Sequence, residues 1–128
     1  MNPPRQKKIL IVDDDPDVRK ILTYKLEKQS YAIIEAKDGI SGLDMFIEES
    51  PNMVMVDVHM PGMDGVQTTV AIVEATKGWV QPPCVFGLTA DVLEEAEADF
   101  LAAGAKAVLT KPFNMERVRE ALLSTTNS

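Results

Sequence analysis

Residues 53–57 read MVMVD and are followed at once by VHMPGMDG at residues 58–65. The first five residues are a short apolar run that ends in one carboxylate, Asp57, and the next eight form a loop rich in Pro and Gly. Such a run is typical of a strand buried on both faces, and these strands belong mostly to parallel sheets covered by helices. Because ligands bind beyond the carboxyl ends of the strands in an open parallel sheet, we expect Asp57 to enter a functional cleft.

The rest of the chain alternates strands with amphipathic helices. We expect strands at 9–12, 31–36, 53–56, 84–88 and 107–109. The first two helices are expected to begin near residues 16 and 39, and the other three to span 65–76, 91–103 and 115–123. Inward positions on the first three helices are expected to be Val18, Ile21, Leu22 and Leu26, then Leu43, Phe46 and Ile47, then Val66, Thr69, Val70 and Val73. Right-handed crossovers then predict an α/β fold, a doubly wound, flavodoxin-like (βα)5 sandwich with a five-stranded parallel sheet in order 2-1-3-4-5.

Length and charge limit the class of protein. A chain of 128 residues fits a single domain, 1–128 with its core at about 8–123. A net charge of −7 argues against nucleic-acid binding. No apolar segment has the length of a membrane span and no signal peptide is visible, so we expect no membrane insertion. The single Cys84 cannot form an intramolecular disulfide; it fits a small buried hydrophobic residue and a cytoplasmic location.

Acidic residues follow the first strand as well as the third. The predicted strand order places the ends of these two strands side by side, so Asp13, Asp14 and Asp57 would meet in one crevice. Carboxylates that lie this close repel one another unless a cation is present. Oxygen ligands suit Mg²⁺, with Mn²⁺ as the second candidate. A simple helix cap is the alternative for the acidic run, and it suits Asp15 best, leaving Asp13 and Asp14 for the metal.

Polar residues also end the fourth and fifth strands. Thr89 places a hydroxyl at the cleft, although it could simply cap the next helix, and Lys111 places an ammonium among the carboxylates. An Asp carboxylate can act as a nucleophile, and a divalent cation neutralises a transferring phosphoryl group. We therefore expect phosphoryl transfer to Asp57, with Lys111, Thr89 and backbone N–H groups after Asp57 binding the phosphoryl oxygens. Val58 and Ala90, which follow Asp57 and Thr89, are the corresponding binding positions.

These motifs together resemble the receiver (response regulator) domains of two-component signalling. The matching segments are ILIVDDDP at 9–16, Asp57 with MPGMDG at 60–65, LTA at 88–90 and KPF at 111–113. Each segment is a weak signal alone, but the four in this order and spacing are specific. The resemblance covers residues 8–123.

The resemblance implies a role for each matching residue. Asp57 would be the phosphoacceptor and, with Asp14, a side-chain ligand of Mg²⁺. Asp13 would act on the metal largely through water, and His59 would contribute its backbone carbonyl. Thr89 and Lys111 would be the switch hydroxyl and the phosphate-binding cation.

The resemblance also implies partners and an output. The donor would be a sensor histidine kinase or a histidine phosphotransfer protein, and the chain would be no enzyme beyond its own phosphorylation and slow dephosphorylation. We expect a monomer or a weak phosphorylation-dependent dimer. The output would pass to an unidentified partner through a phosphorylation-dependent face on the fourth helix, the fifth strand and the fifth helix, which includes Glu94, Glu95, Lys106, Arg117 and Arg119.

Three positions depart from the family or are open to two interpretations. Many receivers carry a Tyr or Phe at the position of Val108, and this ring rotates inward when the switch Thr contacts the phosphoryl group. The aromatic half of the usual switch is therefore absent here. Trp79 lies in a somewhat long loop, 77–83, and is expected to cover the third helix, with contact to a partner as the alternative. His59 could influence attack of water on the phosphoryl group, or it could be a solvated loop side chain.

Other functions remain as alternatives. One is a phosphorelay intermediate, or the receiver segment of a hybrid histidine kinase. More distant ones are a Mg²⁺-dependent phosphohydrolase and a flavodoxin-like binding protein. A flavin phosphate would need a Ser, Thr or Gly loop after the first strand, whereas the run from Asp13 to Asp15 would repel it.

Overall fold

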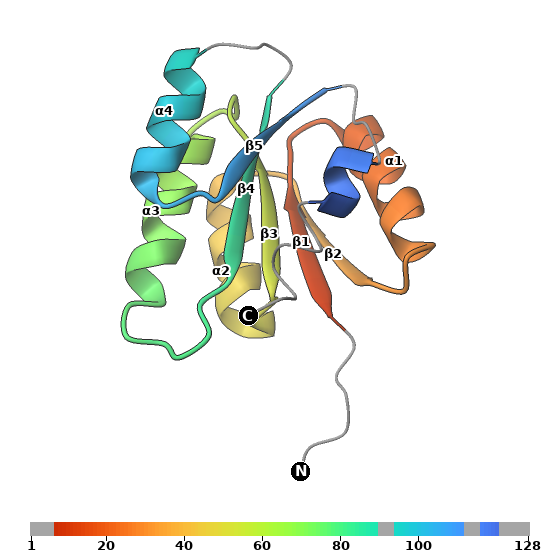
Figure 1. The fold of residues 1–128 in the computed structure, drawn as a ribbon, viewed down its shortest axis with the longest axis horizontal. Helices are drawn as coiled ribbons and strands as arrows, with labels where there is room; N and C mark the ends of the chain where they lie inside the picture. Colours follow the sequence, from red (N-terminus) through yellow and green to blue (C-terminus); the bar gives the residue numbers. More distant parts are fainter. Residues whose placement is uncertain (1–6, 90–93, 112–115, 121–128) are drawn as a thin grey trace.

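The computed structural model describes residues 7–89, 94–111 and 116–120. One sheet contains five parallel strands in the order β2-β1-β3-β4-β5 (Figure 1). They are β1 (Lys8–Val12), β2 (Ala32–Ala36), β3 (Met53–Asp57), β4 (Cys84–Thr89) and β5 (Ala107–Thr110). The predicted doubly wound fold and its strand order are confirmed.

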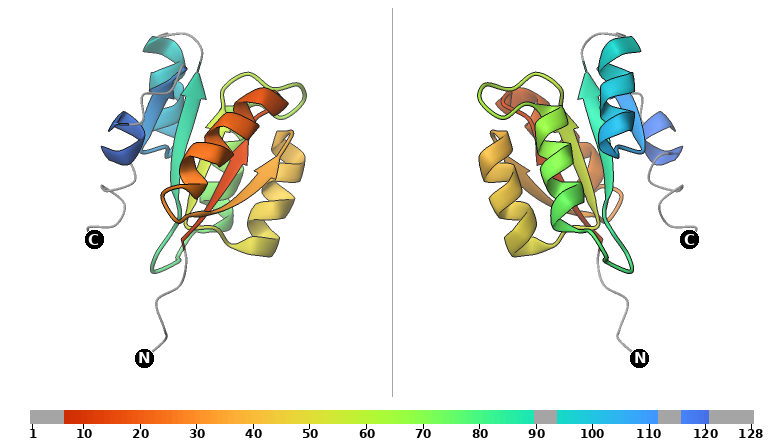
Figure 2. Two further views of the ribbon diagram at one scale, coloured as in Figure 1. Left: turned by 90° about the vertical axis from the view of Figure 1, so that its right-hand side faces the viewer. Right: turned by 90° about the vertical axis from the view of Figure 1, so that its left-hand side faces the viewer.

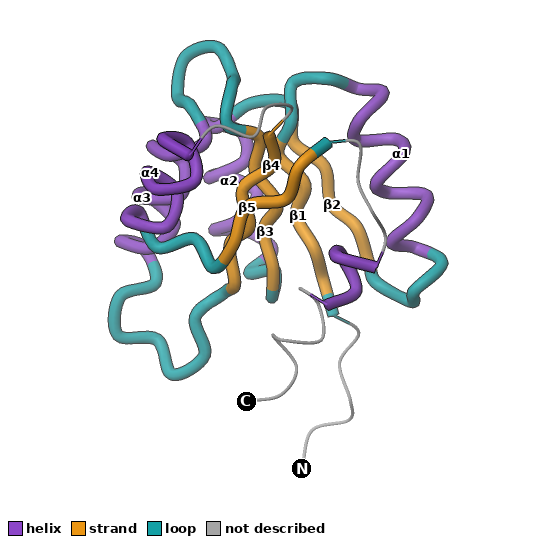
Figure 3. Tube along the Cα trace, turned by 45° about the horizontal axis from the view of Figure 1, so that its top comes forward, coloured by secondary structure: helices purple, strands orange, loops and turns teal. Residues whose placement is uncertain are grey.

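Helices cover both faces of the sheet. They are α1 (Pro16–Glu27), α2 (Gly39–Glu49), α3 (Gly65–Ala75) and α4 (Glu94–Ala103), and residues 116–120 are also helical. Figure 2 shows α2, α3 and α4 side by side in one layer, while Figures 1 and 3 show α1 and the segment 116–120 on the other side of the sheet. Within the described ranges, no helix is long and apolar enough to span a membrane.

The core consists of two clusters, one on each face of the sheet. Leu10, Val12, Val54 and Val56 pack with Phe46, Ile72 and Phe100 from the α2, α3 and α4 layer. Ile9, Ile11, Met53 and Met55 pack with Leu22 and Leu26 of α1 and with Val118. Because successive strand residues point to opposite faces, the apolar runs predicted as doubly buried strands supply both clusters.

Local capping explains where three helices begin. Asp15 is the N-cap of α1, as predicted, and Asp38 and Asp64 are the N-caps of α2 and α3. At α3 the Asp64 carboxylate accepts a hydrogen bond from the Gln67 N–H, and the Gln67 side chain accepts one from the Asp64 N–H, which is a capping box. Gly104 follows α4 with a φ of +114°, a conformation that suits glycine directly after a helix. Asp91, where the fourth helix is predicted to begin, and Asn114, directly before the predicted last helix, lie outside the described residues.

Some predictions of burial were wrong. Four side chains expected to point inward are exposed, namely Ile21, Ile47, Val70 and Val73. The buried face of α3 carries Thr69, as predicted, together with Thr68 and Ile72, which were not predicted to point inward. The two threonine hydroxyls donate to the carbonyls of Asp64 and Gly65 one turn earlier, so their burial leaves no hydroxyl without a partner. Helical spacing placed Thr69 inward, but hydropathy favoured Val70 and Val73 over Thr68.

Trp79 makes a contact that the sequence did not predict. Its ring is half-exposed and stacks on Phe46 of α2, with centroids 6.1 Å apart and an angle of 21° between the planes. Cys84 is only partly buried, because it begins β4 at the edge of the second core cluster. The loop that carries Trp79 lies at the opposite end of the sheet from the carboxyl ends of the strands (Figure 1).

Candidate functional site

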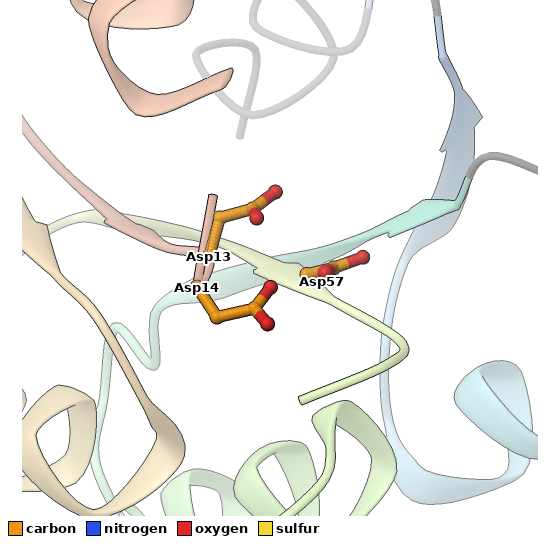
Figure 4. Close-up of side chains that lie close together, drawn as sticks. All are labelled: Asp13, Asp14 and Asp57. Atoms are coloured by element: carbon orange, nitrogen blue, oxygen red, sulfur yellow. The ribbon is translucent and has the colours of Figure 1, made fainter. Parts of the chain in front are cut away.

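Three carboxylates meet where β1 and β3 end. These strands are neighbours in register, with Val12 beside Val56, so Asp13 and Asp14 emerge next to Asp57. One carboxylate oxygen from each residue lies within 4.8 Å of the others, and Figure 4 shows the three side chains around one space. The structure therefore brings together the acidic cluster that the strand order predicts.

Asp13 is buried and makes four hydrogen bonds to other described residues. Its N–H donates to the Ala36 carbonyl at 3.1 Å, and its own carbonyl accepts from Arg19 Nη1 at 2.6 Å. Its carboxylate accepts from the Asp15 N–H at 2.9 Å and from Lys111 Nζ at 3.0 Å. This residue is fixed by the protein itself, with no exposed side-chain surface.

Lys111 joins the two buried carboxylates. Its Nζ lies 3.0 Å from Asp13 Oδ2 and 3.3 Å from Asp57 Oδ1. Its backbone N–H donates to the Thr89 carbonyl at 2.7 Å. This hydrogen bond holds the residue that follows β5 against the end of β4. Burial alone would lower the pKa of Lys111, but the hydrogen bond to Asp13 and the charges of Asp57 and Asp13 raise it above its usual value. The side chain therefore stays an ammonium.

The Asp57 carboxyl is electrostatically strained. Burial raises its pKa, the charge of Asp13 raises it further and Asp14 adds to this, so that the pKa stays above the usual value even though Lys111 lowers it. Among the described residues, the single ammonium of Lys111 does not balance the charge of these three carboxylates. The site thus favours additional positive charge.

A small hard cation fits this donor set. All three ligands are carboxylate oxygens, and no His or Cys in the described chain joins the group. Asp14 is exposed, so a cation held here would keep part of its water shell, as Mg²⁺ usually does. Asp13, Asp14 and Asp57 are the side chains that could hold it.

The predicted phosphoryl-binding residues differ in their burial and in what they contact. Thr89 is buried at the end of β4, one residue beyond the pairing of Asp57 with Leu88. The Val58 N–H, expected to bind a phosphoryl oxygen, instead donates to the Leu88 carbonyl at 2.9 Å, because the β3 to β4 ladder continues past Asp57. The side chain of His59 is exposed. Ala90 lies outside the described residues.

Two residues near the site were not assigned from sequence. Arg19 reaches back from α1 to the Asp13 carbonyl, and its only sequence signal is a cation one helical turn after the acidic run. Gly65 begins α3 directly against the Asp57 carbonyl, where a Cβ atom would overlap the backbone of β3. Its place in the loop motif was noted, but such a close approach is visible only in three dimensions.

Comparison with known proteins agrees with this arrangement. The sequence model of the response regulator receiver domain matches residues 9–123, and the chain therefore belongs to that family. It is a receiver domain of two-component signalling, as the sequence motifs indicated.

Solved structures of receivers share the fold. The chain is similar to the chemotaxis protein CheY4 of Vibrio cholerae, with 26% identity and a TM-score of 0.85 over 94% of this chain and 99% of that one. It is also similar to a chain in the CheX–CheY–BeF3–Mg²⁺ complex from Borrelia burgdorferi, with 28% identity and a TM-score of 0.85 over 95% of this chain and 90% of that one.

Proposed function

We propose that the chain accepts a phosphoryl group on Asp57, with Mg²⁺ bound at the neighbouring carboxylates, and that the donor is a phosphohistidine of a sensor kinase or phosphotransfer protein. The observation that carries the proposal is the shared position of Asp13, Asp14, Asp57 and Lys111. A purely structural cap would not need a buried carboxylate with a raised pKa beside a partly buried ammonium.

The geometry leaves Asp57 with one oxygen for chemistry. Oδ1 faces Lys111, and within the described part of the chain no hydrogen bond engages Oδ2. In the proposed reaction Oδ2 attacks phosphorus, and the bond between phosphorus and the imidazole nitrogen of the donor breaks. A bound Mg²⁺ would neutralise the carboxylates and the phosphoryl oxygens during this step.

Lys111 and Thr89 would then bind the transferred group. Lys111 already contacts Asp57, so its ammonium can move a short way from the carboxylate to a phosphoryl oxygen. Thr89 ends the adjacent strand, and its hydroxyl is a suitable donor. The Borrelia burgdorferi complex contains Mg²⁺ and BeF3, a mimic of the phosphoryl group, which supports this assignment by similarity.

The consequence of phosphorylation would be a change in the surface formed by α4 and β5. Phe100 and Val108 belong to the same core cluster, so movement at Thr89 could be transmitted to α4 through packed side chains. Val108 is only partly buried, and it replaces the aromatic residue that many receivers use here. The proposed output therefore depends on aliphatic packing.

Incubation with a small phosphodonor tests the proposal. With Mg²⁺ present we expect one phosphoryl group per chain, detected as intact mass, and with excess chelator we expect almost none. Equal labelling in both conditions would show that the acidic cluster does not serve the reaction through a metal.

A further inference from the structure

Asp14 is the least constrained member of the acidic cluster. Its side chain is exposed, and within the described ranges it accepts no side-chain or backbone hydrogen bond. Its carboxylate nevertheless reaches the same space as Asp13 and Asp57 (Figure 4). The direction of this side chain must therefore be set by the backbone between Asp13 and Asp14.

Arg19 fixes that backbone. Its Nη1 donates to the Asp13 carbonyl at 2.6 Å, and this carbonyl belongs to the peptide group that joins Asp13 to Asp14. The guanidinium is itself anchored, since its Nε donates to Glu35 Oε1 at 3.2 Å, and the Arg19 side chain is largely buried. One side chain thus ties α1 and β2 to the exit of β1.

We infer that Arg19 is a positioning residue for the divalent-cation site, acting through the Asp13–Asp14 peptide group. This inference rests on the proposed function, because it concerns affinity for the proposed cation. The guanidinium is suited to the task because its planar fork can donate to a carbonyl and a carboxylate at once, whereas the ammonium of a lysine is a single point of charge.

The direction in which Mg²⁺ affinity changes when Arg19 is replaced distinguishes a positioning role from a purely electrostatic one. Arg19 is a cation near three carboxylates, so its positive charge alone opposes binding of another cation, and its removal would tighten Mg²⁺ binding. If its main role is to position Asp14, its removal weakens Mg²⁺ binding instead. Loss of a residue that orients metal ligands typically costs about tenfold or more in affinity.

An NMR titration of the unphosphorylated protein with MgCl2 measures this directly. Backbone amide shifts report both the fold and the dissociation constant for Mg²⁺. We expect the constant to rise about tenfold in Arg19→Ala and by a similar factor in Arg19→Lys, which keeps the charge but not the fork. We expect a smaller rise in Glu35→Gln, which removes the anchor of the guanidinium.

Lys20→Ala is the matched control, because it removes the same charge from the next residue, an exposed one. We expect its constant to be unchanged or slightly lower. An unchanged or tighter constant in folded Arg19→Lys and Glu35→Gln would overturn the inference, even if Arg19→Ala did not fold. Absence of Mg²⁺ binding in the unsubstituted protein would instead overturn the metal in the proposed function.

Discussion

The ammonium of Lys111 lies 3.0 Å from the carboxylate of Asp13, although 98 positions separate the two residues in sequence. The same ammonium lies 3.3 Å from Asp57, so one cation serves two buried carboxylates. The pair joins the exits of β1 and β5, strands that are not neighbours in the sheet. This ion pair therefore contributes both to the stability of the fold and to the charge balance of the site.

We expect Lys111→Met to destabilise the protein by about 2 kcal/mol at pH 7, because it leaves two buried carboxylates without their cation. The pKa of Lys111 is raised, so its stabilisation is fully present below its ordinary pKa of 10.5 and is lost as the pH rises through the folded value. The effect of Lys111→Met should shrink below pH 3.8, where Asp57, whose pKa is raised above that value, is largely protonated. Urea unfolding at the two pH values measures it.

Lys77→Met is the control for this experiment, since Lys77 is exposed in the loop after α3. It should change the free energy of unfolding by less than about 0.5 kcal/mol. Equal effects of the two substitutions at pH 7 would contradict the importance of the ion pair.

Asp57→Asn should stabilise the metal-free protein at pH 7. The pKa of Asp57 is raised in the folded state, mainly by burial and by Asp13, so protonated Asp57 stabilises the fold below its ordinary pKa of 3.8. That stability is lost as the pH rises through the folded value. We expect a gain of about 1 kcal/mol, or a rise in Tm of roughly 4 °C, measured with chelator present.

The gain in stability from Asp57→Asn should vanish below pH 3.8, where residue 57 is neutral both in the original protein and in the variant. A variant that is less stable than the original protein at pH 7 would mean that contact with Lys111 outweighs burial and repulsion at Asp57.

Mg²⁺ should raise the thermal stability of the unsubstituted protein. A ligand that binds only the folded state at ten times its dissociation constant adds about 1.4 kcal/mol. Asp14→Ala should remove this shift with little effect on the Tm without metal, since the side chain is exposed. Asp44→Ala, which removes an exposed carboxylate of α2, should keep the full shift. An undiminished shift in Asp14→Ala would exclude Asp14 as a ligand.

Gly65→Ala should destabilise the protein by about 2 kcal/mol and also slow phosphorylation, because the new methyl group overlaps the Asp57 carbonyl. Gly78→Ala is a useful comparison. Gly78 has a φ of +87° but open space around it, so we expect a cost of about 1 kcal/mol and normal phosphorylation. Denaturant unfolding and the rate of labelling separate the two effects. Normal phosphorylation in Gly65→Ala would count against the close approach at Asp57.

The fold was predictable because its strands are unusually clear in sequence. The runs that became β1 and β3 are apolar throughout, and this is what burial on both faces requires. The helix faces were less predictable. On α3, Thr69 was correctly placed inward, but hydropathy favoured Val70 and Val73, whereas packing buried Thr68, whose hydroxyl donates within the helix.

The site residues that stand at the ends of strands could be predicted from the sequence. Asp13, Asp14, Asp57 and Lys111 meet because the exits of parallel strands share one edge of the sheet. The partner of the Val58 N–H and the reach of Arg19 depend on exact backbone positions, so periodicity and spacing could not give them.

The central claim is that Asp57 is the phosphoacceptor, and intact mass after incubation with a small phosphodonor and Mg²⁺ tests it most directly. We expect one acid-labile phosphoryl group on the unsubstituted protein and on the control Asp44→Asn, which replaces an exposed carboxylate, and none on Asp57→Asn. A phosphoryl group that persists on folded Asp57→Asn at the same rate and yield would contradict it.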